Sequence, residues 1–181
     1  MHATICDMIT DLVQNAFEAQ ATEVRVSFKQ TPKEWHLLIK DNGKGMSADL
    51  LEKAKDPFFT DGQKHVHRSV GLGLPFLFQT AEATQATARV ESKKGQGTQV
   101  EFVVDPQQMD LPALGDLSTT WVHLLSHDFG GNLILQREKN KKTYEVSSQE
   151  LREILGDLND LSGLSLLKEF MTNQELSLEI L

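Results

Sequence analysis

Four short motifs follow one another along this sequence, and their order constrains the fold more than any other feature does. They read DLVQNA at 11–16, DNGKGM at 41–46, GLGLP at 71–75 and GQGT at 95–98. Three of them hold two glycines separated by one residue, which is typical of turns where the backbone needs unusual φ angles or a close approach. A lone glycine pair usually serves turn geometry only, whereas four motifs in a fixed order carry far more information.

The first motif lies in a segment that is predicted to form an amphipathic helix over about 3–21. Apolar residues recur three and four positions apart from Ile5 to Phe17, which predicts one buried helix face. Asp11, Asn15 and Glu18 share a second face with the same spacing. An acid and an amide aligned in this way can hold a hydrated cation and orient a nucleophile. A solvated polar stripe on a surface helix has the same pattern.

Alternating and aperiodic segments lie between the motifs. Period-two patterns predict strands over 23–29, 35–40, 88–92 and 99–104, and helices are expected over 48–55 and from the third motif to about Thr84. The segment Asp56–Val70 holds Pro57, Gly62 and basic residues with no period. We expect this segment to be a mobile loop.

The pattern changes after residue 106, and we therefore divide the chain into a domain over 1–106 and a C-terminal extension over 107–181. We expect a linker over 110–115, an ambiguous helix over 117–129, a hairpin of strands 132–137 and 142–146, and helices over 148–155 and 161–171. Ser147 and Glu150 form a capping-box pattern for the first of these two helices.

Composition and charge exclude several classes of function. The 181 residues are 39% hydrophobic and 24% charged, which suits one globular domain with a small appendage. Residues 1–105 carry 12 basic and 14 acidic side chains, and residues 106–181 carry 6 and 12. This balance argues against nucleic acid or an anionic membrane as a partner. With one cysteine, Cys6, and no signal-peptide or membrane-span pattern, we expect a soluble cytoplasmic protein.

The ordered motifs resemble those of the GHKL ATPases, which include gyrase, the heat-shock chaperone ATPases, the mismatch-repair ATPases and the histidine kinases. The resemblance covers Ala3–Val104. It implies an α+β Bergerat fold, a two-layer α/β sandwich with a mixed, mostly antiparallel sheet, here with a small α/β C-terminal extension. The whole chain is most similar to small stand-alone, histidine-kinase-like ATP-binding ATPase proteins of anaerobic bacteria.

The resemblance also implies roles for matching residues, with ATP and Mg²⁺ as cofactors. Asn15 resembles the asparagine that ligates Mg²⁺, and Asp41 the aspartate that accepts a hydrogen bond from the adenine amino group. Thr98 resembles the threonine near the adenine. Further cofactor contacts are expected from the glycine motifs and the loop before the third motif: Gly43, Gly45, Met46, Lys64, Arg68, Gly71, Leu72, Gly73 and Leu74.

Each group in that set has its own expected part in nucleotide binding. Gly43 and Gly45 would let the backbone approach the adenine. Gly71 and Gly73 resemble the glycines that close over the phosphates, with N–H groups at a helix start. Asp56–Thr60 reads DPFFT and resembles the EPFFT motif of kinase ATP lids, which makes the nearby basic residues candidate phosphate contacts, a solvated loop being the alternative.

Asp11 is the predicted catalytic base. Family members that hydrolyse ATP or phosphorylate a hydroxyl carry a glutamate four residues before the magnesium asparagine, and Asp11 holds that position with a side chain one methylene shorter. A carboxylate there can take a proton from water or from a serine hydroxyl.

Three functions remain open from the sequence. The first is an Mg-ATP-binding regulatory module or slow ATPase that acts on an unidentified partner protein. The second is an anti-sigma-type serine kinase that uses Asp11, and the third is a nucleotide-dependent binding module without turnover. Because only ten residues precede Asp11, we do not expect self-phosphorylation of the two-component type.

The C-terminal extension is expected to complete the sheet. Related ATP modules usually begin with a strand before the first helix, whereas this sequence begins directly at that helix. A missing strand would leave an edge that natural proteins cover or pair. We therefore expect 132–146 to pack on the ATPase domain or extend its sheet, with the last two helices covering it. The alternative is an independent acidic domain that binds a partner or mediates formation of a homodimer.

Overall fold

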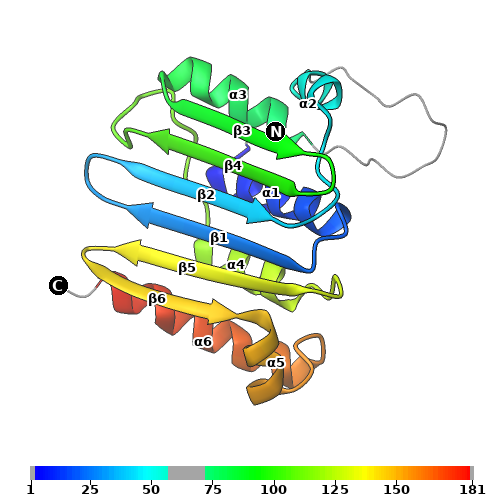
Figure 1. The fold of residues 1–181 in the computed structure, drawn as a ribbon. Coiled ribbons are helices and arrows are strands. Elements are labelled where there is room, and N and C mark those ends of the chain that lie inside the picture. Colours follow the sequence, from blue (N-terminus) through cyan, green and yellow to red (C-terminus); the bar gives the residue numbers. More distant parts are fainter. Residues whose placement is uncertain (1–2, 57–71, 180–181) are drawn as a thin grey trace.

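The computed structural model describes residues 3–56 and 72–179, which build a six-stranded sheet in the order β3-β4-β2-β1-β5-β6 (Figure 1). The strands are β1 Glu23–Gln30, β2 Trp35–Asp41, β3 Thr87–Lys93, β4 Gly97–Val104, β5 Asn132–Lys139 and β6 Lys142–Ser147. Neighbouring strands pair antiparallel except β1 and β5, which are parallel. The sheet is therefore mixed and mostly antiparallel, as predicted.

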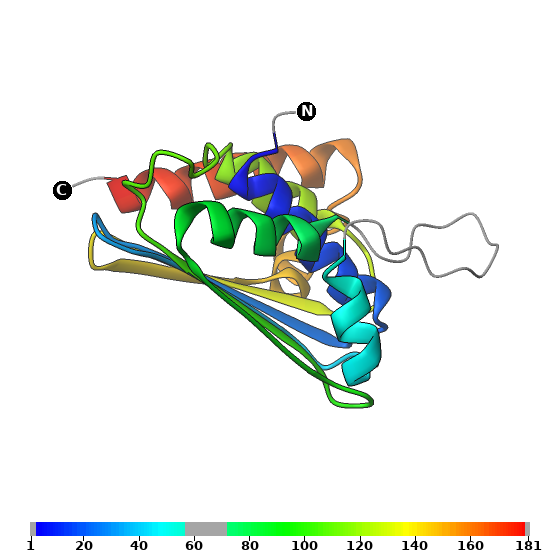
Figure 2. The same cartoon turned by 90° about the horizontal axis from the view of Figure 1, so that it is seen from above.

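The helices form a second layer. They are α1 Ile5–Glu18, α2 Ala48–Ala54, α3 Gly73–Thr84, α4 Leu117–Ser126, α5 Ser148–Leu155 and α6 Leu161–Glu179. Figure 2 shows α1, α3, α4 and α6 on one face of the sheet. This two-layer arrangement confirms the predicted α+β fold. No helix among the described residues is long and apolar enough to cross a membrane.

The core lies between these layers and follows from the two periodicities of the sequence. Alternate residues of β1, from Val24 to Phe28, are buried, while Arg25 and Lys29 are exposed. The facing side of α1 buries the apolar residues three and four positions apart that run from Ile5 to Phe17. Burial of such side chains is the main contribution to stability in a fold of this kind.

The first helix is shorter than the predicted span of 3–21. Thr4 caps it, because its hydroxyl accepts a hydrogen bond from the Asp7 N–H while the Asp7 carboxylate accepts one from the Thr4 N–H at 2.7 Å. The helix ends at Glu18, and Gln20 then adopts a left-handed conformation with φ of 60°. The apolar period alone did not indicate either boundary.

The predicted linker over 110–115 is bound to α1. The N–H groups of Ile5 and Cys6 donate to the carbonyls of Ala113 and Leu114, both at 2.9 Å. These are N–H groups of the first turn, which have no partner inside the helix. The linker therefore completes the start of α1.

The hairpin of β5 and β6 extends the sheet, which confirms that part of the prediction. Residues 23–30 of β1 pair in parallel with residues 132–139 of β5 along their whole length. The helix that follows β6 has the predicted bounds, but the last helix does not. It runs to Glu179 rather than to residue 171, because Glu175 in its last turns accepts hydrogen bonds from the buried Arg137 side chain. The division of the chain at residue 106 stays a prediction.

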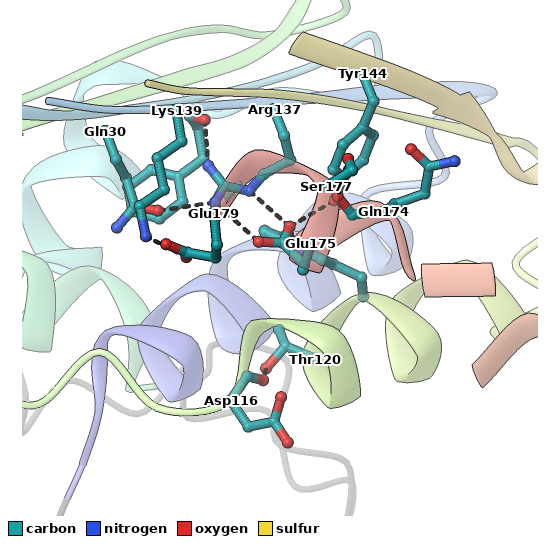
Figure 3. Close-up of polar contacts among 12 residues, drawn as sticks. Gln30, Asp116, Thr120, Arg137, Lys139, Tyr144, Gln174, Glu175, Ser177 and Glu179 are labelled. Atoms are coloured by element: carbon teal, nitrogen blue, oxygen red, sulfur yellow. Dashed lines mark hydrogen bonds and ion pairs between the residues drawn. The ribbon is translucent and has the colours of Figure 1, made fainter. Parts of the chain in front are cut away.

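A buried polar network joins this hairpin to the rest of the fold (Figure 3). The side chain of Arg137, on β5, is fully buried and donates to the Phe28 carbonyl at 2.6 Å and to the Gln30 side chain at 2.8 Å. Its guanidinium also contacts the Glu175 carboxylate at 2.9 Å. Trp121 and Tyr144 donate to the same carboxylate at 3.0 and 2.5 Å. Residues of β1, β5, β6, α4 and α6 thus share one network.

Candidate functional site

A pocket of about 180 Å³ lies between α1, α2, the start of α3 and the inner face of β2 and β4. Its apolar lining includes Leu12, Ile39, Leu50, Leu74 and Val100. Its polar lining includes Asn15, Glu18, Asp41, Lys44 and Thr98. The pocket thus combines an apolar slot with a few polar groups, as small-molecule sites do.

Asp41 is the buried polar group of this pocket, with only 7% of its surface exposed. It ends β2 two residues after Ile39, so the strand alternation turns its side chain inward. Oδ1 accepts a hydrogen bond from the Gly43 N–H at 2.8 Å. Burial raises the pKa of this carboxyl group, and hydrogen bonds from the backbone N–H groups of Gly43 and Thr98 partly offset that effect. The pocket therefore contains an oriented hydrogen-bond acceptor.

The loop after Asp41 is held from two sides. The Lys44 N–H donates to the Ala19 carbonyl at the end of α1, at 2.8 Å, and the Lys44 carbonyl accepts from the Gly95 N–H at 2.6 Å. A Cβ added at Gly43 would lie 2.5 Å from the Ala19 oxygen. One added at Gly45, where φ is +61°, would lie 2.0 Å from the Lys93 oxygen. Both glycines are therefore required by contacts within the chain, a reason that sequence analysis did not supply.

The polar face of α1 reaches the pocket at Asn15 and Glu18 but not at Asp11. Asp11 lies one turn earlier, exposed, beside the start of α3: a Cβ at Gly73 would lie 3.0 Å from the Asp11 Cβ. Partial burial of the carboxyl group and the negative charge of Asp7 raise the pKa of Asp11. The predicted base is thus next to the third motif and not in the pocket lining.

The start of α3 brings the third motif to the same region. Leu72 is the N-cap residue and is 54% exposed, and the helix begins at Gly73 without a side-chain cap from the described residues. Leu74 is buried in the pocket wall. Three predicted cofactor contacts, Lys64, Arg68 and Gly71, lie outside the described residues, as does all of the expected loop after Asp56.

Ser92 was missed by sequence analysis. It lies on β3 opposite Thr98 of β4, and its Oγ is 2.8 Å from the Thr98 Oγ1. The same Oγ accepts a hydrogen bond from the Met46 N–H at 2.8 Å. A serine just before a glycine turn has many roles, so only the strand register connects it with this pocket. Lys44 was also given no role, although it lines the pocket.

The family model described as histidine kinase-, DNA gyrase B-, and HSP90-like ATPase matches residues 2–108. This chain belongs to that family. All four ordered motifs and every described residue of the pocket lining lie within the matched range. Membership of this ATPase family implies the use of ATP.

Curated relatives include sensor kinases and a DNA repair protein. The CAI-1 autoinducer sensor kinase/phosphatase CqsS of Vibrio cholerae is 32% identical over 138 residues, 75% of this chain and 19% of that protein. Sporulation kinase E of Bacillus subtilis is 31% identical over 102 residues, 54% of this chain and 13% of that protein. The DNA mismatch repair protein MutL of Crocosphaera subtropica is 28% identical over 110 residues, 58% of this chain and 19% of that protein.

The GHKL chain thus spans about a fifth or less of the length of these relatives. Among solved structures, the catalytic domain of histidine kinase ThkA in a nucleotide-free form superposes with a TM-score of 0.42 at 22% sequence identity. That match covers 54% of this chain and 63% of the other.

Proposed function

We propose that this chain binds Mg-ATP in the pocket between α1 and the sheet and acts as a GHKL-type regulatory ATPase module on a partner protein. The observation that carries the proposal is the buried Asp41 carboxylate, fixed by the Gly43 N–H at the end of an apolar slot. A buried acceptor suits the exocyclic amino group of adenine. It rejects the carbonyl of guanine, because that mismatch leaves two groups unpaired.

The apolar lining supports a flat ring in this slot. Ile39 and Val100 come from neighbouring strands, where they share a face with Asp41 and Thr98, and Leu12 comes from α1. Burying a heteroaromatic ring between such side chains contributes affinity through the apolar area removed from water. The polar groups then set the orientation of the ring.

Asn15 and the start of α3 are the proposed groups for the phosphates and Mg²⁺. No group of three or more His, Cys, Asp or Glu side chains among residues 3–56 and 72–179 could hold a metal ion alone. Mg²⁺ keeps several waters and is commonly held by one or two protein oxygens together with substrate phosphates. The amide oxygen of Asn15 fits that limited role, and the first-turn N–H groups of α3 suit an anion.

Asp11 is proposed as the general base. It lies on the same helix face as Asn15, one turn away, and next to Gly73. From there its carboxylate would take the proton of the attacking water, or of a hydroxyl on the partner if phosphate is transferred instead.

One experiment tests the proposal and separates the three functions. The protein is incubated with Mg²⁺ and ATP labelled on the γ-phosphate, alone and with cell lysate, while calorimetry measures ATP binding. Release of free phosphate supports the ATPase, a labelled protein band supports the kinase, and binding with neither supports a module without turnover. Asp11→Asn should abolish release or transfer and leave binding unchanged. Absence of ATP binding in the unaltered protein would overturn the proposal.

A further inference from the structure

The hydroxyl of Ser92, on β3, contacts two segments that line the pocket. It accepts a hydrogen bond from the Met46 N–H in the loop after β2. It lies 2.8 Å from the Thr98 hydroxyl and donates to the Gly97 carbonyl at 3.2 Å. Thr98 lines the pocket, whereas Ser92 does not. Any effect of Ser92 on a ligand must therefore pass through these neighbours.

One arrangement of protons satisfies all the contacts of the Ser92 hydroxyl. The Gly97 carbonyl can only accept, so Ser92 is the donor in that contact. A serine hydroxyl has one proton, and with that proton given to Gly97 it must accept in its contact with Thr98. The Thr98 hydroxyl then donates its own proton to Ser92. Only lone pairs of the Thr98 oxygen remain for other partners, so Thr98 offers the pocket an acceptor.

The carboxylate of Asp41 is a second hydrogen-bond acceptor next to Thr98. Asp41 and Thr98 are direct partners in the β2–β4 register, and both line the pocket. The Asp41 carboxylate is held by backbone donors, including the Gly43 N–H at 2.8 Å. Two neighbouring acceptors match a group that carries two N–H donors. A carbonyl in the same place would face lone pairs only, with no donor to satisfy it.

We propose that Ser92 is a positioning residue for base selection. By accepting the Thr98 proton it keeps the Thr98 hydroxyl an acceptor, and this raises the preference of the pocket for a 6-amino purine over a 6-oxo purine. The inference rests on the proposed function, because it requires a purine nucleotide in this pocket. Without the Ser92 acceptor, the Thr98 hydroxyl is free to turn its proton toward a carbonyl at C6.

The test compares ATP with inosine triphosphate, whose base is a 6-oxo purine and lacks the 6-amino group of ATP. Calorimetry with Mg²⁺ gives both affinities for the full chain, for Ser92→Ala and for Ser92→Thr, which retains a hydroxyl. Ser27→Ala, on the outward face of β1, is the matched control. Ser92→Ala should lower the ATP-to-inosine triphosphate affinity ratio by roughly 5- to 30-fold, the effect of one hydrogen bond. Ser92→Thr and Ser27→Ala should keep the ratio of the unaltered chain.

The ratio separates a positioning role from a structural one. Loss of the Met46 hydrogen bond would weaken the binding of both nucleotides equally. Equal losses of affinity, with an unchanged affinity ratio, would therefore overturn the inference. If Ser92→Ala does not fold, Ser92→Cys decides instead, because its thiol is a weak acceptor of similar size. An unaltered chain that binds neither nucleotide overturns the proposed function and the inference together. If the unaltered chain binds ATP and Ser92→Ala has the same affinity ratio as the unaltered chain, the inference alone is overturned.

Discussion

Asp41 is a carboxylate at a position where the strand pattern places an apolar side chain. It follows Leu37 and Ile39 on the inward face of β2, and all three are buried. Burying an ionisable group costs free energy unless hydrogen bonds compensate. Here backbone N–H groups supply that compensation, yet burial still leaves the pKa of Asp41 raised. Such perturbed groups in a pocket are candidates for function rather than for stability.

Substitution of Asn15 or Asp41 should therefore affect nucleotide binding more than folding. Asn15→Ala should weaken Mg-ATP binding, and Asp41→Asn should disturb base selection, each by about 1–3 kcal/mol or roughly 5- to 150-fold. Calorimetry measures both, with Gln14→Ala on the same helix as the control. Unchanged affinity in both variants would show that the pocket is not the nucleotide site.

The pH dependence of ATP hydrolysis should reveal the electrostatic interaction between Asp7 and Asp11. The negative charge of Asp7 contributes to the raised pKa of Asp11. Asp7→Asn removes that charge and should lower the pKa of Asp11. If Asp11 must be ionised to act as the base, the fall in ATPase rate on acidification should then move to lower pH. Asp7→Glu keeps the charge and serves as control, and a pH–rate profile that does not move would argue against Asp11 as the base.

Secondary elements were predictable where a period was present. The alternation over 23–29 and 35–40 located β1 and β2 within a residue of their observed ends. The helix expected over 48–55 is observed over Ala48–Ala54. Boundaries set by single contacts were not predictable. The last helix continues past residue 171 because Glu175 meets Arg137, a partner 38 residues away on β5. Ser92 was likewise not predicted as a site residue, because only the β3–β4 register places it opposite Thr98.

The tight turn between β2 and α2 provides a test of element packing. Gly45 and Gly95 both have positive φ, but a Cβ at Gly45 would lie 2.0 Å from the Lys93 oxygen, whereas one at Gly95 meets nothing within 4 Å. Gly95→Ala should cost about 1–2 kcal/mol from the left-handed backbone alone. Gly45→Ala should lower the free energy of unfolding, measured in urea, by more than this, because a backbone carbonyl must also move. Equal losses would mean that the close contact is absent in solution.

At the scale of the whole molecule, the Arg137 network links β1 to the C-terminal hairpin and to α4 and α6. Burial alone would raise the pKa of Glu175, but the hydrogen bonds and charge of Arg137, with hydrogen bonds from Tyr144 and Trp121, outweigh it and lower the pKa. A lowered carboxyl pKa contributes stability above the unfolded value of 4.5 and loses it as pH falls through the lower folded value.

Removal of the Glu175 charge should accordingly destabilise the protein strongly. Glu175→Gln leaves the Arg137 charge buried without its counter-ion, which costs on the order of 3–5 kcal/mol. Because glutamine does not titrate, the variant should also lack the part of the stability loss below about pH 4.5 that comes from protonation of Glu175. Urea unfolding at pH 7 and pH 4 measures both effects, with exposed Glu169→Gln on α6 as control. A loss below about 1 kcal/mol at pH 7 would contradict a buried ion pair.

Truncation after Pro106 tests the same unity on a larger scale. It removes β5 and exposes the hydrogen-bonding edge of β1 together with the inward face of Phe28. Because exposed strand edges promote association, fragment 1–106 should aggregate or melt well below the full chain. Light scattering and thermal unfolding measure this. A fragment that is monomeric and as heat-stable as the full chain would support an independent C-terminal domain.

The parallel pairing of β1 with β5 also has a consequence for synthesis on the ribosome. Phe28 and Arg137, which meet in that pairing, are 109 residues apart in the sequence. At the usual rate of about 5–20 residues per second, the second strand follows the first after roughly 5–20 s. Throughout that interval the β1 edge of the nascent sheet has no partner strand. Contacts this distant in sequence form slowly. A chaperone that shields the β1 edge during translation would act on the step at which this topology is most exposed to misassembly.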